Sequence, residues 1–378
     1  MRKFIFAVML ILVTSIQNIA GAANFNNIDW KNAPRFNSKA EFFKYIKECE
    51  KNCKTEIAVI FTNGLLVNVD EFLKVSTNSQ YVNITWLNEK PVKALYETGI
   101  YPGAKVEYAY RTGNTSILSA DEKKLYNVAV QIVNEAKKQP TPLQKELFLH
   151  EKITQKVSYY TAQTNSKAPR HCTAIGALID GRANCQGYVD AFYMLGRMAG
   201  LNVGKMTGVA NNTPHAWNSI TFGDGRIYAV DVTFDDASFV LSDGEYNNYI
   251  YFNAPLEILK TTHTWEAAYN PTLQPKIDGR YFYCTKEFFE TDGKYFAFNA
   301  RSAEEALNYI AQRISKNGYR FSWGMAPYNS NYANTKFSLN RLVREILPNQ
   351  YNFYGQAKMS IARRGNWIFY TVDAQSNN

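Results

Sequence analysis

The sequence predicts an α+β fold in which a long helix packs on an antiparallel sheet. Apolar residues after Asn184 recur at the spacing of an α-helix up to Gly200, a residue type that commonly ends helices. Residues 215–222 and 226–232 alternate between apolar and polar side chains, and a turn-forming Gly-Asp-Gly sequence separates them. A helix followed by a hairpin of these lengths indicates one core of mixed helix and sheet.

Cys185 directly follows Asn184, which is a favourable N-cap, so the cysteine falls in the first turn of this helix. The unpaired N–H groups and the positive end of the helix dipole favour a thiolate there, and the thiolate is the reactive form of cysteine. The same N–H groups can hold an oxyanion. A cysteine behind an apolar helix is, taken alone, more often a buried core residue, so its partners decide between the two interpretations.

The length of the hairpin loop decides whether His215 and Asp231 can meet, because strand side chains change faces at every residue. A three-residue loop with Gly225 in the left-handed conformation pairs Trp217 with Asp231. His215 and Asp231 are then diagonal neighbours on one face, within reach of a hydrogen bond. A two-residue loop would instead pair Asn218 with Asp231 and turn the carboxylate to the opposite face. The catalytic interpretation therefore requires the three-residue loop.

Structural roles compete with chemical ones at these positions. A histidine beside Trp217 is often structural, and Asp231 can cap the turn that follows it. We favour catalysis because a nucleophile, a base and an orienting acid occur together, with the base and the acid on one hairpin face. The alternative is a degenerate domain that kept the fold.

Three motifs resemble the core of the transglutaminase-like superfamily, whose members have a papain-like fold. They are Asn-Cys-Gln-Gly-Tyr around Cys185, His-Ala-Trp-Asn from His215, and Val-Asp-Val-Thr-Phe-Asp-Asp around Asp231. The resemblance, to exported bacterial members, implies Cys185 as the nucleophile, His215 as general base and acid, and Asp231 as the group that fixes the imidazole. It does not separate the activities found within the superfamily.

The resemblance extends from the helix that begins at Thr141 to His263, which is well under half of the chain. Tyr159 or Tyr160 is a candidate for the second oxyanion donor by position. The segments 249–253 and 263–265 are expected to pack against the active site, without a catalytic role for His263.

Two helices open the catalytic region. Ser119 to Glu122 is a capping box for the first, and Thr141 followed by a proline begins the second. His150 lies on the apolar face of the second helix and is expected to be a core histidine. His171 precedes the nucleophile and has no evident partner in the sequence.

Residues 1–23 are predicted to be a signal peptide, with Arg2 and Lys3 before a short apolar run and small residues at a cleavage site. No other stretch approaches the length of a membrane span. We expect an exported bacterial protein, secreted or associated with the cell envelope. The predicted parts are a small α+β module, a catalytic domain and a second small α+β module, at residues 24–115, 116–272 and 273–378.

The two flanking modules have similar patterns. A capping box begins at Ser38 and another at Ser302, and a strand-like segment follows each, at 57–61 and at 319–323. Further strands are predicted at 81–87 and 105–110. The similar tripeptides at residues 104–106 and 357–359 follow later, at comparable positions in the two modules. A duplicated module and two unrelated modules remain equally good explanations.

The formal net charge of +9 has no long basic run, which suggests anionic cell-envelope polymers as partners and argues against nucleic acid. The chain has five cysteines, so at least one stands outside any internal disulfide. Cys49 with Cys53, and Cys172 with Cys284, can pair or stay free. Neither a zinc site nor a cofactor is predicted.

These observations predict an exported cysteine acyl-transfer enzyme that attacks amide bonds of peptide or cell-envelope substrates. We favour a peptidase or amidase, since the sequence has no separate amine-binding feature. The alternatives are a protein-crosslinking transglutaminase, which uses the same triad, and a non-catalytic envelope-binding protein with a degenerate core.

Overall fold

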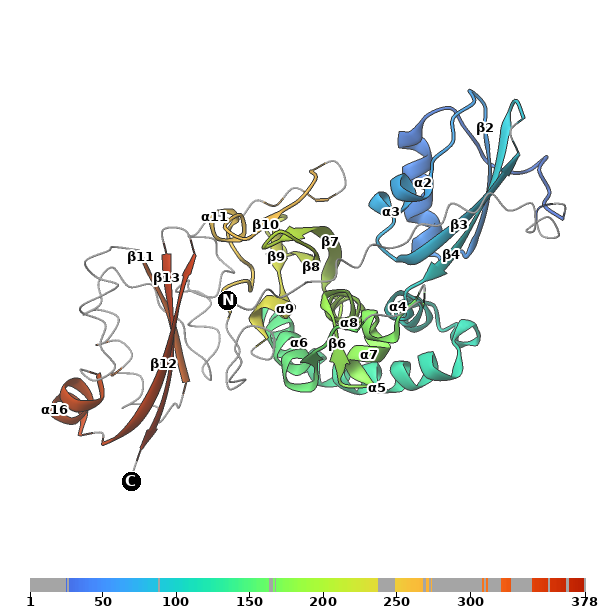
Figure 1. The fold of residues 1–378 in the computed structure, drawn as a ribbon. Coiled ribbons are helices and arrows are strands. Elements are labelled where there is room, and N and C mark those ends of the chain that lie inside the picture. Colours follow the sequence, from blue (N-terminus) through green and yellow to red (C-terminus); the bar gives the residue numbers. More distant parts are fainter. Residues whose placement is uncertain are drawn as a thin grey trace.

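The computed structural model describes a helical and sheet core with an α+β unit before it and a three-stranded sheet after it (Figure 1). The residues described are 25, 27–87, 89–162, 166, 168–236, 249–267, 270, 271, 273, 308, 311, 321–327, 342–352, 354–364 and 367–376. The predicted signal peptide, the capping box at Ser302 and Cys284 lie outside these residues.

The first unit packs two helices on a four-stranded sheet of order β1-β2-β4-β3. Phe42, Phe61, Phe72 and Tyr96 are buried between the helices and the sheet. Ser38 caps the first helix through the N–H of residue 41, as its sequence predicts. The elements are β1 (Arg35–Phe36), α2 (Lys39–Lys51), β2 (Glu56–Phe61), α3 (Val69–Val75), β3 (Ser79–Leu87) and β4 (Val92–Ile100).

The strand predicted at 105–110 is wrong, because this segment lies in helix α4 (Pro102–Thr112). A proline in the first turn and a left-handed Gly113 after the last turn define the helix ends. Val106 and Ala109, three residues apart, enter the core of the next unit. Residues 104–106 are therefore helical, whereas 357–359 belong to strand β12 (Gly355–Arg364), so this part of the proposed duplication fails.

The central unit is built around α8 (Cys185–Met198), of which most residues are buried. In Figure 1 the sheet β10-β7-β8-β9 lies on one side of α8, and helices α5 to α7 lie on another. Its elements are α5 (Ala120–Lys137), α6 (Pro142–Lys156), β5 (Ser158–Tyr159), η3 (Arg170–Cys172), α7 (Ala174–Leu178), β6 (Arg182–Ala183), β7 (Asn202–Ala210), β8 (Thr213–Thr221), β9 (Ile227–Val230), α9 (Val232–Asp235), α11 (Leu256–Leu259) and β10 (His263–Thr264).

The predicted helix starts of the central unit are confirmed. Ser119 and Glu122 form a complete capping box on α5, and the Thr141 hydroxyl accepts the N–H of Gln144 at the start of α6. These caps satisfy N–H groups that would otherwise lack a partner. They also define the first residue of each helix.

The last unit has the sheet order β11-β13-β12, with β11 (Phe321–Pro327), β12 and β13 (Trp367–Ser376) all antiparallel. The strand predicted at 319–323 overlaps β11. A π-helical turn (Leu342–Ile346) and α16 (Leu347–Tyr351) precede β12. Across the described residues, no helix combines the length and apolar character needed to span a bilayer. The boundaries at 115 and 272 stay predictions.

Candidate active site

Cys185 is the first residue of α8, as its sequence predicts. The Asn184 side chain accepts the N–H of Gly187 at 3.3 Å, which fixes the N-terminal turn. The thiol is partly exposed and makes no disulfide. This exposure at a helix start is the environment in which a cysteine can act as a nucleophile, in contrast to a buried core cysteine.

The three-residue loop of the hairpin is confirmed. Gly225 has φ 75°, and its N–H donates to the carbonyl of Phe222 at 3.0 Å. Asn218 pairs with Val230 across β8 and β9. This register places Asp231, one residue beyond β9, opposite the residue before Asn218, and so on the face of His215.

His215 lies between Cys185 and Asp231. Its Nε2 is 2.7 Å from the Asp231 Oδ2, and its side chain is 6% exposed. Burial alone would lower the pKa of His215. The charge of Asp231, the hydrogen bond to it, and the hydrogen bond and charge of Cys185 raise this pKa to about 10. The imidazole therefore has the two partners that a base between a thiol and a carboxylate requires.

Asp231 both caps a helix and binds imidazole, so the two interpretations of this residue hold together. Its Oδ1 accepts the N–H groups of Thr233 and Phe234 at 3.0 and 3.1 Å, at the start of α9. Its Oδ2 faces His215. Burial would raise the pKa of Asp231, but the charge of His215 and the hydrogen bonds from two imidazoles hold it well below its ordinary value. Asp231 is thus a fully paired carboxylate at 1% exposure.

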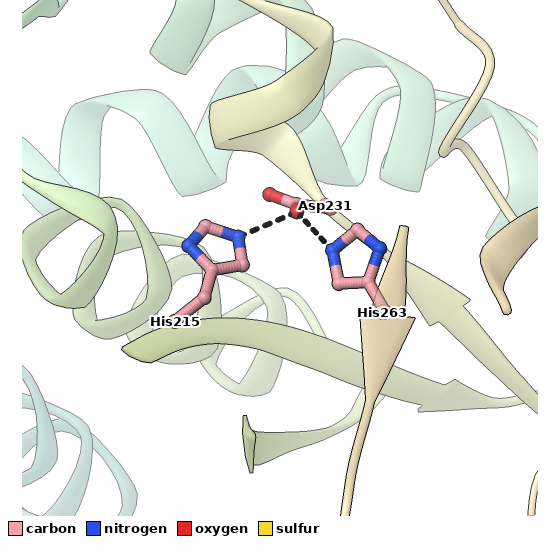
Figure 2. Close-up of side chains that lie close together, drawn as sticks. All are labelled: His215, Asp231 and His263. Carbon is pink, nitrogen blue, oxygen red and sulfur yellow. Dashed lines mark hydrogen bonds and ion pairs between the residues drawn. The ribbon is translucent and has the colours of Figure 1, made fainter. Parts of the chain in front are cut away.

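The second imidazole on Asp231 belongs to His263, which lies on β10. Its Nε2 is 3.0 Å from the same Oδ2 (Figure 2). The sequence predicts that this segment packs against the site, and that is confirmed. The sequence does not predict the direct bond from His263 to Asp231, because that bond depends on the pairing of β10 with β7. Periodicity in a two-residue strand carries no such information.

The two tyrosines proposed as oxyanion donors differ in position. Burial, followed by the charges of Cys185 and Asp231, raises the pKa of Tyr159, which is part of β5. Tyr160 is exposed, with the Arg182 guanidinium 4.9 Å from its ring centroid. Tyr159 therefore stays the better candidate for an oxyanion donor, because it is the less exposed of the two tyrosines and the charge of Cys185 acts on it.

The other two histidines do not reach the thiol or Asp231 by a hydrogen bond. His150 is completely buried, with Nε2 3.1 Å from the Oδ2 of Asp235, as expected for a core histidine. Burial lowers the pKa of His150 to about 3, although the charge of Asp231 opposes this. His171 packs edge-on against Tyr160, with ring centroids 5.6 Å apart.

The other three described cysteines are free thiols in less reactive surroundings. Burial raises the pKa of Cys172 to about 11 and that of Cys53 to about 12, and it also raises the pKa of Cys49. The Asn184 side chain donates to the Cys172 sulfur at 3.0 Å. A disulfide between Cys49 and Cys53 is absent from the described part of the chain.

Within the described residues, the donor atoms of His215, Asp231 and His263 lie within 4.8 Å of one another, close enough for a divalent cation. Each imidazole Nε2 already contacts the Asp231 Oδ2, and such contacts require a proton on nitrogen. A cation would have to displace both protons inside a buried cluster. We therefore describe these residues as a hydrogen-bonded group.

Residues 129–232 match the family model of the transglutaminase-like superfamily, a match that includes Cys185, His215 and Asp231. This segment is a transglutaminase-like core. No curated protein matches the chain significantly. The transglutaminase-like core accounts for less than half of the chain, and the units before and after it lie outside the matched residues.

Several solved structures share distant similarity with the chain. A crystal structure of a TGase has 11% identity and a TM-score of 0.28, covering 58% of this chain and 63% of that one. LapG of Legionella pneumophila has 14% identity and a TM-score of 0.23, covering 34% and 72%. The periplasmic domain of TgpA from Pseudomonas aeruginosa has 15% identity and a TM-score of 0.25, covering 38% and 56%. The chain thus spans less than two thirds of the TGase and TgpA structures, and scores this low support no conclusion about its activity.

Proposed function

We propose that this chain is an exported cysteine acyl-transfer enzyme that attacks amide bonds, acting as a peptidase or amidase on peptide or cell-envelope substrates. The observation that carries the proposal is the His215 imidazole, whose Nε2 lies 2.7 Å from the Asp231 Oδ2 and whose pKa, despite burial, is raised by Asp231 and by Cys185. A nucleophile, a base and an orienting carboxylate in this order are the requirements for covalent acyl transfer. The transglutaminase-like core supports the same chemistry.

The reaction would proceed in two halves. His215 takes the thiol proton, the Cys185 sulfur attacks the amide carbonyl, and the N–H groups at the start of α8 stabilise the oxyanion. The imidazolium then gives its proton to the leaving amine, and the C–N bond breaks to leave a thioester on Cys185. Water, deprotonated by His215, attacks this thioester, and collapse releases the acid and the free thiol. Asp231 stays ionised throughout and fixes the imidazole.

Thiol alkylation followed by peptide mass spectrometry tests the site without knowledge of the substrate. Cys185 should be alkylated fastest in the folded protein, since burial raises the pKa of Cys49, Cys53 and Cys172. His215→Ala should slow Cys185 by about tenfold or more and leave the other cysteines unchanged, because general-base assistance contributes on the order of 10²-fold. Equal rates at Cys185 in both proteins would refute the proposed site.

Substrate assays then separate the possible activities. A peptidase or amidase should release amines from peptides or from cell-wall fragments, and Cys185→Ala should abolish the release. Incorporation of a labelled amine into a glutamine-containing protein would instead identify a crosslinking transglutaminase. Retention of Cys185→Ala on isolated cell walls, without any turnover by the wild type, would support an envelope-binding protein.

Export is part of the proposal and rests on residues 1–23. N-terminal sequencing of the protein recovered outside the cytoplasm should find a start close to residue 24. A start at residue 1 would remove export from the proposed function.

A further inference from the structure

His263 is buried beside the proposed triad and shares the oxygen of Asp231 that His215 uses. Its Nε2 lies 3.0 Å from Asp231 Oδ2, and the His215 Nε2 lies 2.7 Å from the same atom. In Figure 2 the two imidazoles approach that oxygen from opposite sides, one from β8 and the other from β10. His263 is fully buried, so a substrate cannot touch it directly.

The second nitrogen of His263 also has a hydrogen-bond partner. Its Nδ1 lies 2.8 Å from the Thr262 hydroxyl, which in turn lies 3.0 Å from the Tyr251 hydroxyl. The ionised carboxylate of Asp231 only accepts, so the contact at Nε2 requires a proton there. A neutral imidazole would then accept at Nδ1 from the Thr262 hydroxyl, which also lies 3.4 Å from the Leu259 carbonyl. Of the two neutral tautomers, only the one protonated at Nε2 satisfies both contacts.

The protein encloses this imidazole closely. The rings of Trp217, Phe234 and Tyr251 surround it, with centroids 4.9, 5.0 and 5.3 Å from the imidazole centroid. A side chain at Gly208 on β7 would overlap the backbone carbonyl of Thr264, so the glycine lets β10 approach. The surrounding rings and the approach of β10 to β7 hold the His263 imidazole in an orientation that directs Nε2 at Asp231.

We propose that His263 is a positioning residue for the active site, holding the Asp231 carboxylate in the plane in which Oδ2 meets His215. The inference rests on the proposed function for its consequence in catalysis, whereas the geometry that carries it is independent of any substrate. Backbone N–H groups hold Oδ1, and His263 is the further donor that holds Oδ2. Without His263, His215 would be the one imidazole left on Oδ2. The carboxylate could then rotate and carry Oδ2 away from the His215 imidazole.

His150 offers a matched control elsewhere in the same core. It is also a fully buried histidine, with Nε2 3.1 Å from an aspartate, Asp235, and it also packs against aromatic rings. It makes no hydrogen bond to Asp231 in the described residues. If removing any buried imidazole slows Cys185 alkylation, the rate should fall in the variants of both His150 and His263. If the release of Asp231 is the cause, the rate should fall only in the His263 variant.

The experiment compares His263→Leu, His263→Gln and His150→Leu in the full mature chain. The rate of Cys185 alkylation at pH 7 should fall by about tenfold or more in His263→Leu, since one hydrogen bond to a buried charge is lost. Gln at 263 carries an amide N–H near the position of Nε2 and should restore the rate to within about threefold of wild type. His150→Leu should leave the alkylation rate within about twofold of wild type. Equal losses at 150 and 263, or a wild-type rate in His263→Leu, would overturn the inference.

Nitrogen NMR of the imidazoles gives a second readout that needs no reactive thiol. The chain has only four histidines, so each can be assigned by substitution. His263 should be a single tautomer protonated at Nε2, and His263→Leu should shift the His215 signals while His150→Leu should not. These results together with an unreactive Cys185 would retain the positioning role and reject the proposed function. A reactive Cys185 with His263 protonated only at Nδ1 would do the reverse.

Discussion

Replacing Asp190 by asparagine is expected to destabilise the central unit strongly, because this carboxylate joins three helices and a strand. It is completely buried on α8. Its Oδ2 accepts the N–H of Gly103 at the start of α4 and the N–H of Ala174 at the start of α7, at 2.9 and 3.0 Å. Its Oδ1 accepts the Lys205 ammonium on β7 at 2.9 Å.

The size of the effect follows from what the substitution leaves behind. Lys205 is 8% exposed and has the rings of Tyr101 and Tyr193 within 4.4 and 4.8 Å, which offset only part of its charge. Removing one partner of a buried ion pair costs about 3–5 kcal/mol, since the other charge stays buried and unpaired. We expect Asp190→Asn to lose about 3–5 kcal/mol of the unfolding free energy. The double variant with Lys205→Met should recover part of that loss, because the unpaired charge is gone.

Urea titration with pulsed thiol labelling measures this loss within the central unit. Cys172 is 2% exposed, so its labelling reports unfolding of this unit rather than of the flanking sheets. The control is Glu135→Gln, which breaks the exposed pair with Lys138 and should change stability by less than about 1 kcal/mol. A loss at Asp190→Asn no larger than that of the control would refute the reasoning, as would a double variant less stable than the single one.

Three further substitutions test other parts of the structure. Gly208→Ala should cost about 1–3 kcal/mol and slow Cys185 alkylation, because its Cβ would overlap the carbonyl of Thr264; unchanged stability in urea would contradict this. Burial raises the pKa of Glu146 to about 8, with partial opposition from a hydrogen bond, so the folded protein keeps a proton that the unfolded chain loses. The unfolding free energy should therefore fall as the pH rises from the unfolded to the folded pKa of Glu146, by up to about 1.4 kcal/mol per pH unit. Glu146→Gln should remove that slope in urea titrations. Asp231→Asn removes the charge that opposes burial at His215, so NMR titration should find the pKa of His215 well below 10; a value still near 10 would assign the shift to another group.

The parts of the site that the sequence predicts are those fixed by local geometry. The N-cap at Asn184 and the loop at Gly225 each depend on a few adjacent residues, so the positions of Cys185, His215 and Asp231 follow from turn chemistry and register. Alternating polarity over residues 105–110 favours a strand, whereas the structure has helix α4 there. Its proline start and its contact with α8 outweigh that alternation.

His263 could not be derived in this way, because it lies 32 residues beyond Asp231 and reaches it only through strand pairing. The local and the distant contacts nevertheless depend on one side chain. Asp231 caps α9 with one oxygen and receives two imidazoles on the other, so both sets of contacts orient its carboxylate. A glutamate at 231 would have an extra bond and could not satisfy the cap and both histidines with the same geometry. The residue that ends the hairpin thus determines where β10 must bring the second imidazole, and the absence of a side chain at Gly208 lets it arrive there.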